Sequence, residues 1–93
     1  MLTMEDCIAM SDLTEDEIDA IAEHEHLPEM AALEMGWYLV QTPEGERRIK
    51  RMIVEDIDHA HRRGDSAHAA KLKLVLRQYI EQHPRAVEDE AAE

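Results

Sequence analysis

The chain of 93 residues is long enough for one domain and too short to combine a deep cleft with a separate scaffold. Gly and Pro occur three times each, Phe is absent, and the common residues favour helices, so we predict an all-α fold. A single Cys excludes an internal disulfide, no stretch is long and apolar enough to span a membrane, and the start lacks a signal-peptide pattern. We therefore expect a cytoplasmic protein without a membrane partner.

The net charge of −12 is distributed unevenly along the chain. Residues 1–46 carry thirteen acidic residues and no Lys or Arg, residues 47–85 carry ten basic and five acidic residues, and residues 86–93 carry four acidic residues. In one interpretation the acidic helices pack beside the basic ones and screen them. In the other, one surface stays charged and recruits a partner of opposite sign.

Two capping patterns mark the first helices. Residues 1–13 form an N-terminal arm, in which Thr3 is suited to cap a short helix. The main bundle, predicted over residues 14–83, begins at Thr14. This residue and Glu17 form a capping box for a helix that runs to about residue 26.

The stretch 28–41 is the most apolar part of the chain. It starts at Pro28, which separates it from the preceding helix, and its apolar residues surround nearly the whole circumference. A helix that is apolar all round is a buried helix, so we expect other helices to wrap it and Trp37 to lie in the core. Gly36 would allow another helix to approach closely. If Trp37 is exposed instead, it is the best candidate anchor for a partner.

Two long helices complete the predicted bundle of four main helices. Thr42 and Pro43 start a helix that runs to about residue 63, and Gly64 stops it. Asp65 caps a helix that runs to about residue 82, and the short turn between the two predicts an antiparallel hairpin. The predicted core residues of the hairpin are Ile49, Met52, Ile53, Ile57, Ala60, Leu72, Val75, Leu76, Tyr79 and Ile80. Residues 84–93 are predicted to be an acidic, disordered tail.

Histidine and carboxylate residues suggest a metal site. Glu23 and His26 are spaced i, i+3, as in carboxylate-bridged metal bundles, and Glu55 and His59 are spaced i, i+4 on a later helix. These four residues are the predicted ligands of a Zn or Fe ion held between two helices. The opposing interpretation is that histidines near a helix end bond its last carbonyls and interact with its dipole.

Basic residues cluster at the start of the helix that follows Pro43. The cluster consists of Arg47, Arg48, Lys50 and Arg51. With Trp37 it forms the predicted partner-binding set. Nucleic-acid binding through this cluster is the weakest alternative, because the net charge is negative and no aromatic residues alternate with the basic ones. More often such residues pair with neighbouring acidic groups.

The run DLTEDEIDAIAEHEHLPEMAALEMGWYLVQTPEG at 12–45, followed by IKRMIVEDI at 49–57, resembles a group of small bacterial helical proteins that share an AIAEHEHLPE-type segment. The resemblance covers about half of the chain. The group has no assigned activity, so the resemblance implies no functional residues. It does make His24, His26 and Pro28 worth testing together.

The sequence contains no nucleophile with a base and an orienting group, and no Gly-rich phosphate loop. We therefore predict a protein-interaction module without a catalytic centre, which docks on a protein partner or on a copy of itself. A metal-binding helical bundle is the alternative. Without a metal, no cofactor is expected.

Overall fold

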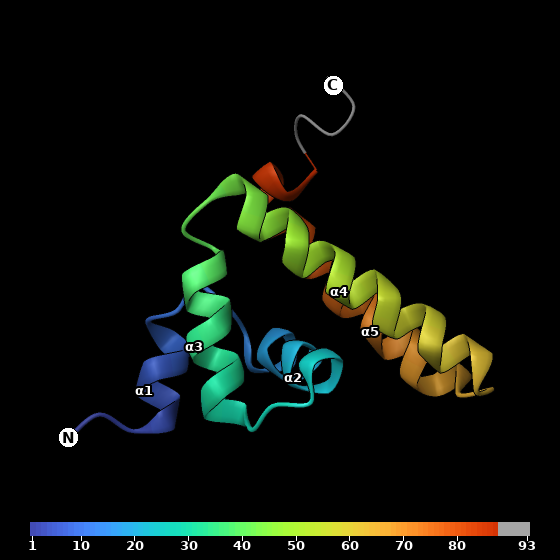
Figure 1. The fold of residues 1–93 in the computed structure, drawn as a ribbon, viewed down its shortest axis with the longest axis horizontal. Helices are drawn as coiled ribbons and strands as arrows, with labels where there is room; N and C mark the ends of the chain where they lie inside the picture. The colour runs from blue at the N-terminus through green and yellow to red at the C-terminus, as the bar shows by residue number, and fades with distance from the viewer. Residues whose placement is uncertain (88–93) are drawn as a thin grey trace.

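The computed structural model describes residues 1–87 and contains helices without strands in that range (Figure 1). The elements are α1 (Met4–Ala9), α2 (Glu15–Glu25), α3 (Glu29–Leu39), α4 (Pro43–Arg62), α5 (Ser66–Gln82) and the 3-10 helix η1 (Pro84–Ala86). The prediction of an all-α fold with four main helices and a short N-terminal helix is confirmed. No helix among the described residues is both long and apolar enough to cross a bilayer.

Local signals in the sequence account for most helix ends. Thr14 accepts a hydrogen bond from the Glu17 amide at 3.1 Å, and the Glu17 carboxylate accepts one from the Thr14 amide at 2.8 Å, which completes the predicted capping box. The hydroxyl of Thr42 caps α4, and the carboxylate of Asp65 caps α5. Gly64 adopts a φ of 77° after the end of α4, as a helix-stop glycine does.

Helices α4 and α5 lie side by side as the predicted hairpin (Figure 1). Helix α2 packs against both of them, and α3 contacts α2 and α4. The core lies where these helices meet. Its fully buried large residues come from α2, α4 and α5, namely Ile18, Ile21, Ile49, Ile53 and Tyr79. Burial of such side chains is the main favourable term in folding, at about 1.5–3 kcal/mol each.

Helix α3 differs from its prediction. The buried residues of this helix are Ala32, Leu33, Gly36 and Leu39. The exposed apolar residues are Met30, Trp37 and Tyr38, whose exposed fractions are 45%, 54% and 73%. The prediction that Trp37 lies in the core is therefore wrong. The physical reason is position, because α3 packs on α2 and α4, and the short helix α1 on its outer side leaves Trp37 and Tyr38 uncovered (Figure 1).

The predicted disordered tail begins with ordered structure. Pro84–Ala86 form η1, Ala86 is fully buried, and η1 contacts α4. The Arg85 guanidinium donates a hydrogen bond from Nη2 to the Glu46 carboxylate at 2.6 Å. This ion pair holds η1 against the start of α4. The remainder of the predicted tail, residues 88–93, lies outside the described residues.

Gly45 permits the tight connection between α3 and α4, and its replacement by Ala is expected to destabilise the fold. A Cβ atom at this position would lie 1.8 Å from the Leu39 carbonyl oxygen, which belongs to the backbone. Ala favours helix by about 1 kcal/mol over Gly. Overpacking against backbone costs more, so we expect the free energy of unfolding to fall by about 2 kcal/mol.

Urea denaturation followed by circular dichroism measures this loss, with Gly36→Ala as the comparison. A Cβ atom on Gly36 would meet the ends of the Leu13 and Ile21 side chains, which can shift. The Gly36 variant should therefore lose less stability than the Gly45 variant. An unchanged or increased stability of Gly45→Ala would contradict the observed packing.

Candidate functional site

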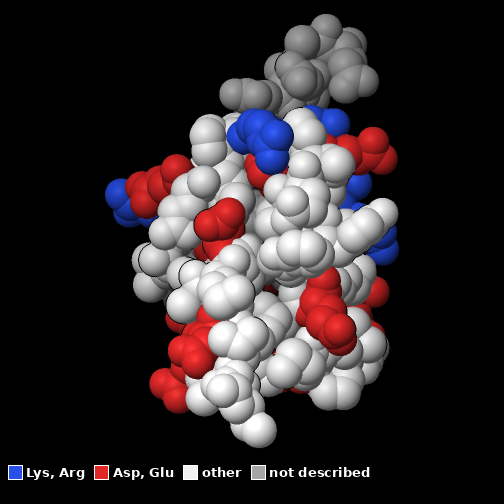
Figure 2. Space-filling view, turned by 90° about the vertical axis from the view of Figure 1, so that its left-hand side faces the viewer, with Lys and Arg blue, Asp and Glu red and all other residues white. Residues whose placement is uncertain are grey.

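An apolar groove lies between α1 and α3 on the surface of the protein. It has a volume of about 560 Å³, and its lining includes Cys7 and Met10 from the N-terminal arm and Leu33, Trp37 and Tyr38 from α3. Trp37 and Tyr38 expose more than half of their surface. Figure 2 shows the face of the molecule on which α1 and α3 lie. Exposed apolar patches rimmed by polar residues often mark interaction sites.

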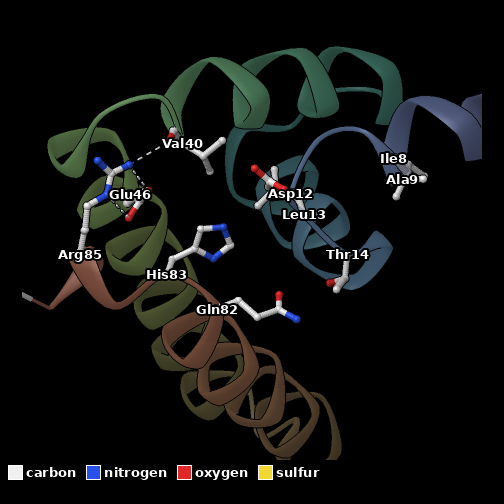
Figure 3. A pocket seen from close by; sticks show the side chains of 10 residues that line it. All are labelled: Ile8, Ala9, Asp12, Leu13, Thr14, Val40, Glu46, Gln82, His83 and Arg85. Carbon is white, nitrogen blue, oxygen red and sulfur yellow. Dashed lines mark hydrogen bonds and ion pairs between the residues drawn. The ribbon is translucent and has the colours of Figure 1, made fainter.

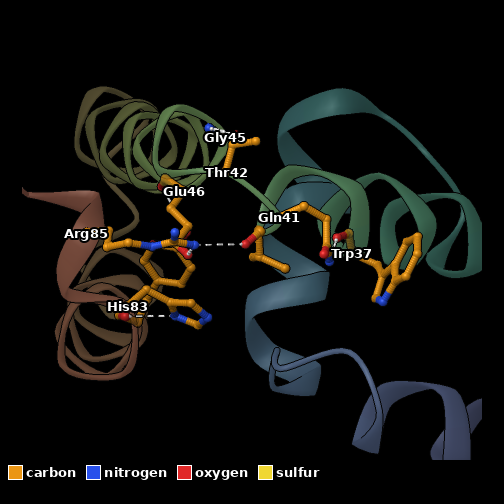
Figure 4. Close-up of polar contacts among 9 residues, drawn as sticks. Trp37, Gln41, Thr42, Gly45, Glu46, His83 and Arg85 are labelled. Atoms are coloured by element: carbon orange, nitrogen blue, oxygen red, sulfur yellow. Dashed lines mark hydrogen bonds and ion pairs between the residues drawn. The ribbon is translucent and has the colours of Figure 1, made fainter.

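The positions of Gly36, Trp37 and Tyr38 around α3 explain why the aromatic side chains reach the groove. Gly36 sits against the ends of the Leu13 and Ile21 side chains, so this side of α3 faces the core. Successive residues of a helix are rotated by about 100°, so Trp37 and Tyr38 project away from that contact. Figure 4 shows the Trp37 indole directed away from the polar contacts around Glu46, while the Gln41 amide donates to the Trp37 carbonyl at 2.8 Å.

The two helices beside the groove carry acidic residues and no basic ones. Helix α1 contains Glu5 and Asp6, and helix α3 contains Glu29 and Glu34. Of these four residues, Glu34 lines the groove itself. In Figure 2 red acidic groups are scattered among the white surface of this face, and blue basic groups lie in its upper part. An acidic apolar groove favours a ligand that is apolar and positively charged.

A second, more polar pocket of about 580 Å³ lies where the α1–α2 loop meets the end of α5 (Figure 3). Its most buried polar side chains are those of Glu46 and His83. Glu46 is paired with Arg85, which also donates from Nη2 to the Val40 carbonyl at 3.4 Å. The His83 ring lies on the ring of Tyr79, with its Nδ1 donating to the Tyr79 carbonyl at 3.1 Å. These contacts join η1 to the ends of α3 and α5, which is a structural role.

The predicted metal ligands are not brought together. Glu23 accepts a hydrogen bond from the His68 ring at 2.7 Å, and Glu55 bonds the His24 ring at 2.5 Å. His26 follows the end of α2 with a φ of 57°, so the helical spacing assumed between it and Glu23 does not apply. Among residues 1–87, no group of three or more His, Cys, Asp or Glu side chains is placed to hold a metal ion.

A buried carboxyl group lies next to these histidine pairs. Asp56 has an exposed fraction of 1%, and its Oδ2 has no hydrogen-bond partner within the described part of the chain. Burial and, to a smaller extent, the charge of Glu23 raise the pKa of Asp56 to about 6, and the charges of His24, His59 and His68 oppose the shift. The group is therefore partly protonated near neutral pH.

The pKa of His24 is raised by its carboxylate neighbours. Partial burial lowers this pKa, but the hydrogen bonds to Glu55 and Glu25 raise it by more. His24 Nδ1 lies 2.7 Å from the Glu25 carboxylate. His24 thus bridges α2 and α4, and the hydrogen bonds of His24 and His68 hold helices together.

The basic cluster of α4 is spread around the helix. Arg48 and Arg51 are exposed, whereas Arg47 and Lys50 are partly buried. Arg48 and Arg51 line a hollow together with Glu25 and Glu55. Acidic side chains therefore share this surface with the basic ones. Trp37, the fifth residue of the predicted partner-binding set, lies in the apolar groove instead.

Comparisons with protein families, with curated proteins and with solved structures find no match for this chain. The resemblance of residues 12–45 to small bacterial proteins therefore stays a prediction. Three residues of the groove lining, Met10, Met30 and Tyr38, were not among the predicted site residues. The signal for Met30 and Tyr38 was the apolar surplus of 28–41, which encircles the helix and exceeds what one buried face requires.

Asp56 makes the stability of the protein dependent on pH. Its pKa rises from 3.8 to about 6 on folding, so the folded state retains a proton that the unfolded state releases in that window. The free energy of unfolding therefore falls as pH rises from about 4 to about 7, by up to about 3 kcal/mol from this group. Asp56→Asn should flatten this dependence.

Urea denaturation at a series of pH values measures the slope, with Asp58→Asn as the matched control. Asp58 is exposed on the same helix, so its variant should keep the slope of the wild type. Burial also raises the pKa of Glu17, which leaves a residual slope of the same sign in the Asp56 variant. Equal slopes for the wild type and Asp56→Asn would show that Asp56 does not titrate in this way.

Proposed function

We propose that this protein is an interaction module that docks on a protein partner through the groove between α1 and α3. The exposed aromatic pair Trp37 and Tyr38 on an otherwise core-like helix carries the proposal. Trp and Tyr are enriched among the residues that contribute most to binding. Their rigid rings also lose little conformational entropy when a partner covers them.

The groove combines features that a docking site needs. It is concave and apolar, and its anchors stand on helices and not on a loop. The Gly36 contact fixes the orientation of α3, so the aromatic side chains are presented before the partner arrives. Covering a large apolar side chain completely contributes about 1.5–3 kcal/mol. The aromatic pair together with Met10 and Met30 supplies the apolar surface that a partner would cover.

The other functions considered from the sequence have less support. The side chains of Glu23 and Glu55 are engaged by His68 and His24, which weakens the metal-binding alternative. The exposed arginines of α4 share their surface with carboxylates, which weakens nucleic-acid binding.

Trp37→Ala should abolish recovery of the partner without unfolding the protein. Trp37 is more than half exposed, so its removal leaves the core intact. In a pull-down from the lysate of the native host, we expect the variant to recover the wild-type partner at least about tenfold less efficiently. Circular dichroism of the purified variant is the check that it remains folded.

Leu74→Ala is the matched control for the pull-down. Leu74 is 67% exposed on α5 and lies outside the groove. The control should recover as much partner as the wild type. Equal recovery by Trp37→Ala and the wild type would refute docking through the groove.

A further inference from the structure

We infer that the occupant of the groove is an amphipathic helix of another protein, with its apolar face flanked by Lys and Arg. This inference rests on the proposed function and specifies the chemistry of the partner. It follows from the secondary structure of the groove walls, from their charge and from the apolar surface elsewhere on this chain.

The walls of the groove favour a helix over an extended segment. An extended segment needs backbone partners, as at the open edge of a sheet. Helices α1 and α3 use their backbone groups in their own hydrogen bonds, and residues 1–87 contain no strand. A helix satisfies its own backbone and offers side chains at i, i+3 or i+4 and i+7. The eleven residues of α3 extend about 16 Å, which accommodates three such anchors.

The acidic charge around the groove favours an occupant with basic residues on both sides of its apolar face. Helices α1 and α3 carry Glu5, Asp6, Glu29 and Glu34 without a compensating Lys or Arg. The whole of residues 1–46 lacks basic residues. Acidic flanks on the occupant would be repelled, whereas basic flanks accelerate association and fix its orientation. In Figure 2 the lower part of this face shows acidic groups, and the basic groups lie in its upper part.

A second copy of this chain fits the groove less well. Its best basic and apolar face is on α5, where Leu74 lies among Lys71, Lys73 and Arg77. Leu74 is the single large apolar side chain that the described part of α5 exposes. One anchor does not fill a groove of about 560 Å³ that is lined by several apolar residues. The occupant is therefore assigned to a different protein.

Trp37 provides the readout for a direct test, because it is the single Trp of the chain and lines the groove. Three synthetic helical peptides without Trp are titrated against the full-length protein. All three carry Leu at i, i+3, i+4 and i+7, and their flanks are Lys, Gln or Glu. We expect the Lys peptide to shift the Trp37 emission to shorter wavelength and to bind at least about tenfold more tightly than the Glu peptide.

Two variants, Glu34→Lys and Asp58→Lys, distinguish the effect of charge at the groove on peptide binding from the effect of net charge. Both make the same change in net charge, but Glu34 lines the groove and Asp58 is exposed on α4 outside it. The Glu34 variant should bind the Lys peptide about fivefold more weakly, and the Asp58 variant should bind it within about twofold of the wild type.

Three other results would overturn part or all of the inference. Equal binding of the Lys and Gln peptides, with no difference between the two variants, would overturn the basic flanks and leave the groove as a docking site. Absence of binding by all three peptides would overturn the helical occupant, whereas the proposed function fails only if Trp37→Ala retains its partner. Concentration-dependent self-association with a shift in Trp37 emission would assign the groove to a second copy.

Discussion

The close contact of Gly36 with Leu13 and Ile21 determines which side of α3 faces the solvent. A Cβ atom at this position would lie 2.6 Å from Leu13 Cδ1 and 3.0 Å from Ile21 Cδ1, so only a glycine lets α3 sit this close without a shift of those side chains. The contact turns Trp37 and Tyr38 outward, and with α1 it creates the groove (Figure 1). The candidate site thus depends on a packing contact made by the residue that directly precedes Trp37 in the same helix.

Three buried carboxyl groups show how a small acidic protein keeps charge inside its fold. Glu46 is paired with Arg85, which ties η1 to the start of α4. Glu17 caps α2 with one oxygen, and burial raises its pKa. Asp56 is held near a pKa of 6 among histidines, where partial protonation reduces the cost of burying it. The buried ionisable groups thus lie between helices, whereas α3 exposes three large apolar side chains, those of Met30, Trp37 and Tyr38.

Local rules predicted the fold well, because capping residues, prolines and glycines act on their own neighbours in sequence. The capping box of Thr14 and the stop at Gly64 are examples. The exposure of Trp37 could not be predicted, since it depends on how many helices cover α3. Whether the four predicted metal ligands come together likewise depends on how the helices pack. The partner of Glu23 is His68, which lies forty-five residues away and which no local spacing identifies.

The central claim is that the outer face of α3 contacts a partner in the cell. Site-specific photocrosslinking in the native host tests it most directly, with benzoylphenylalanine placed at Tyr38 in one variant and at Leu74 in another. Both side chains are exposed, but only Tyr38 lines the groove. We predict one dominant covalent adduct from position 38, with a basic helical segment of another protein at the crosslink, and none from position 74. Absence of an adduct at position 38, or equal adducts at both positions, would contradict the account.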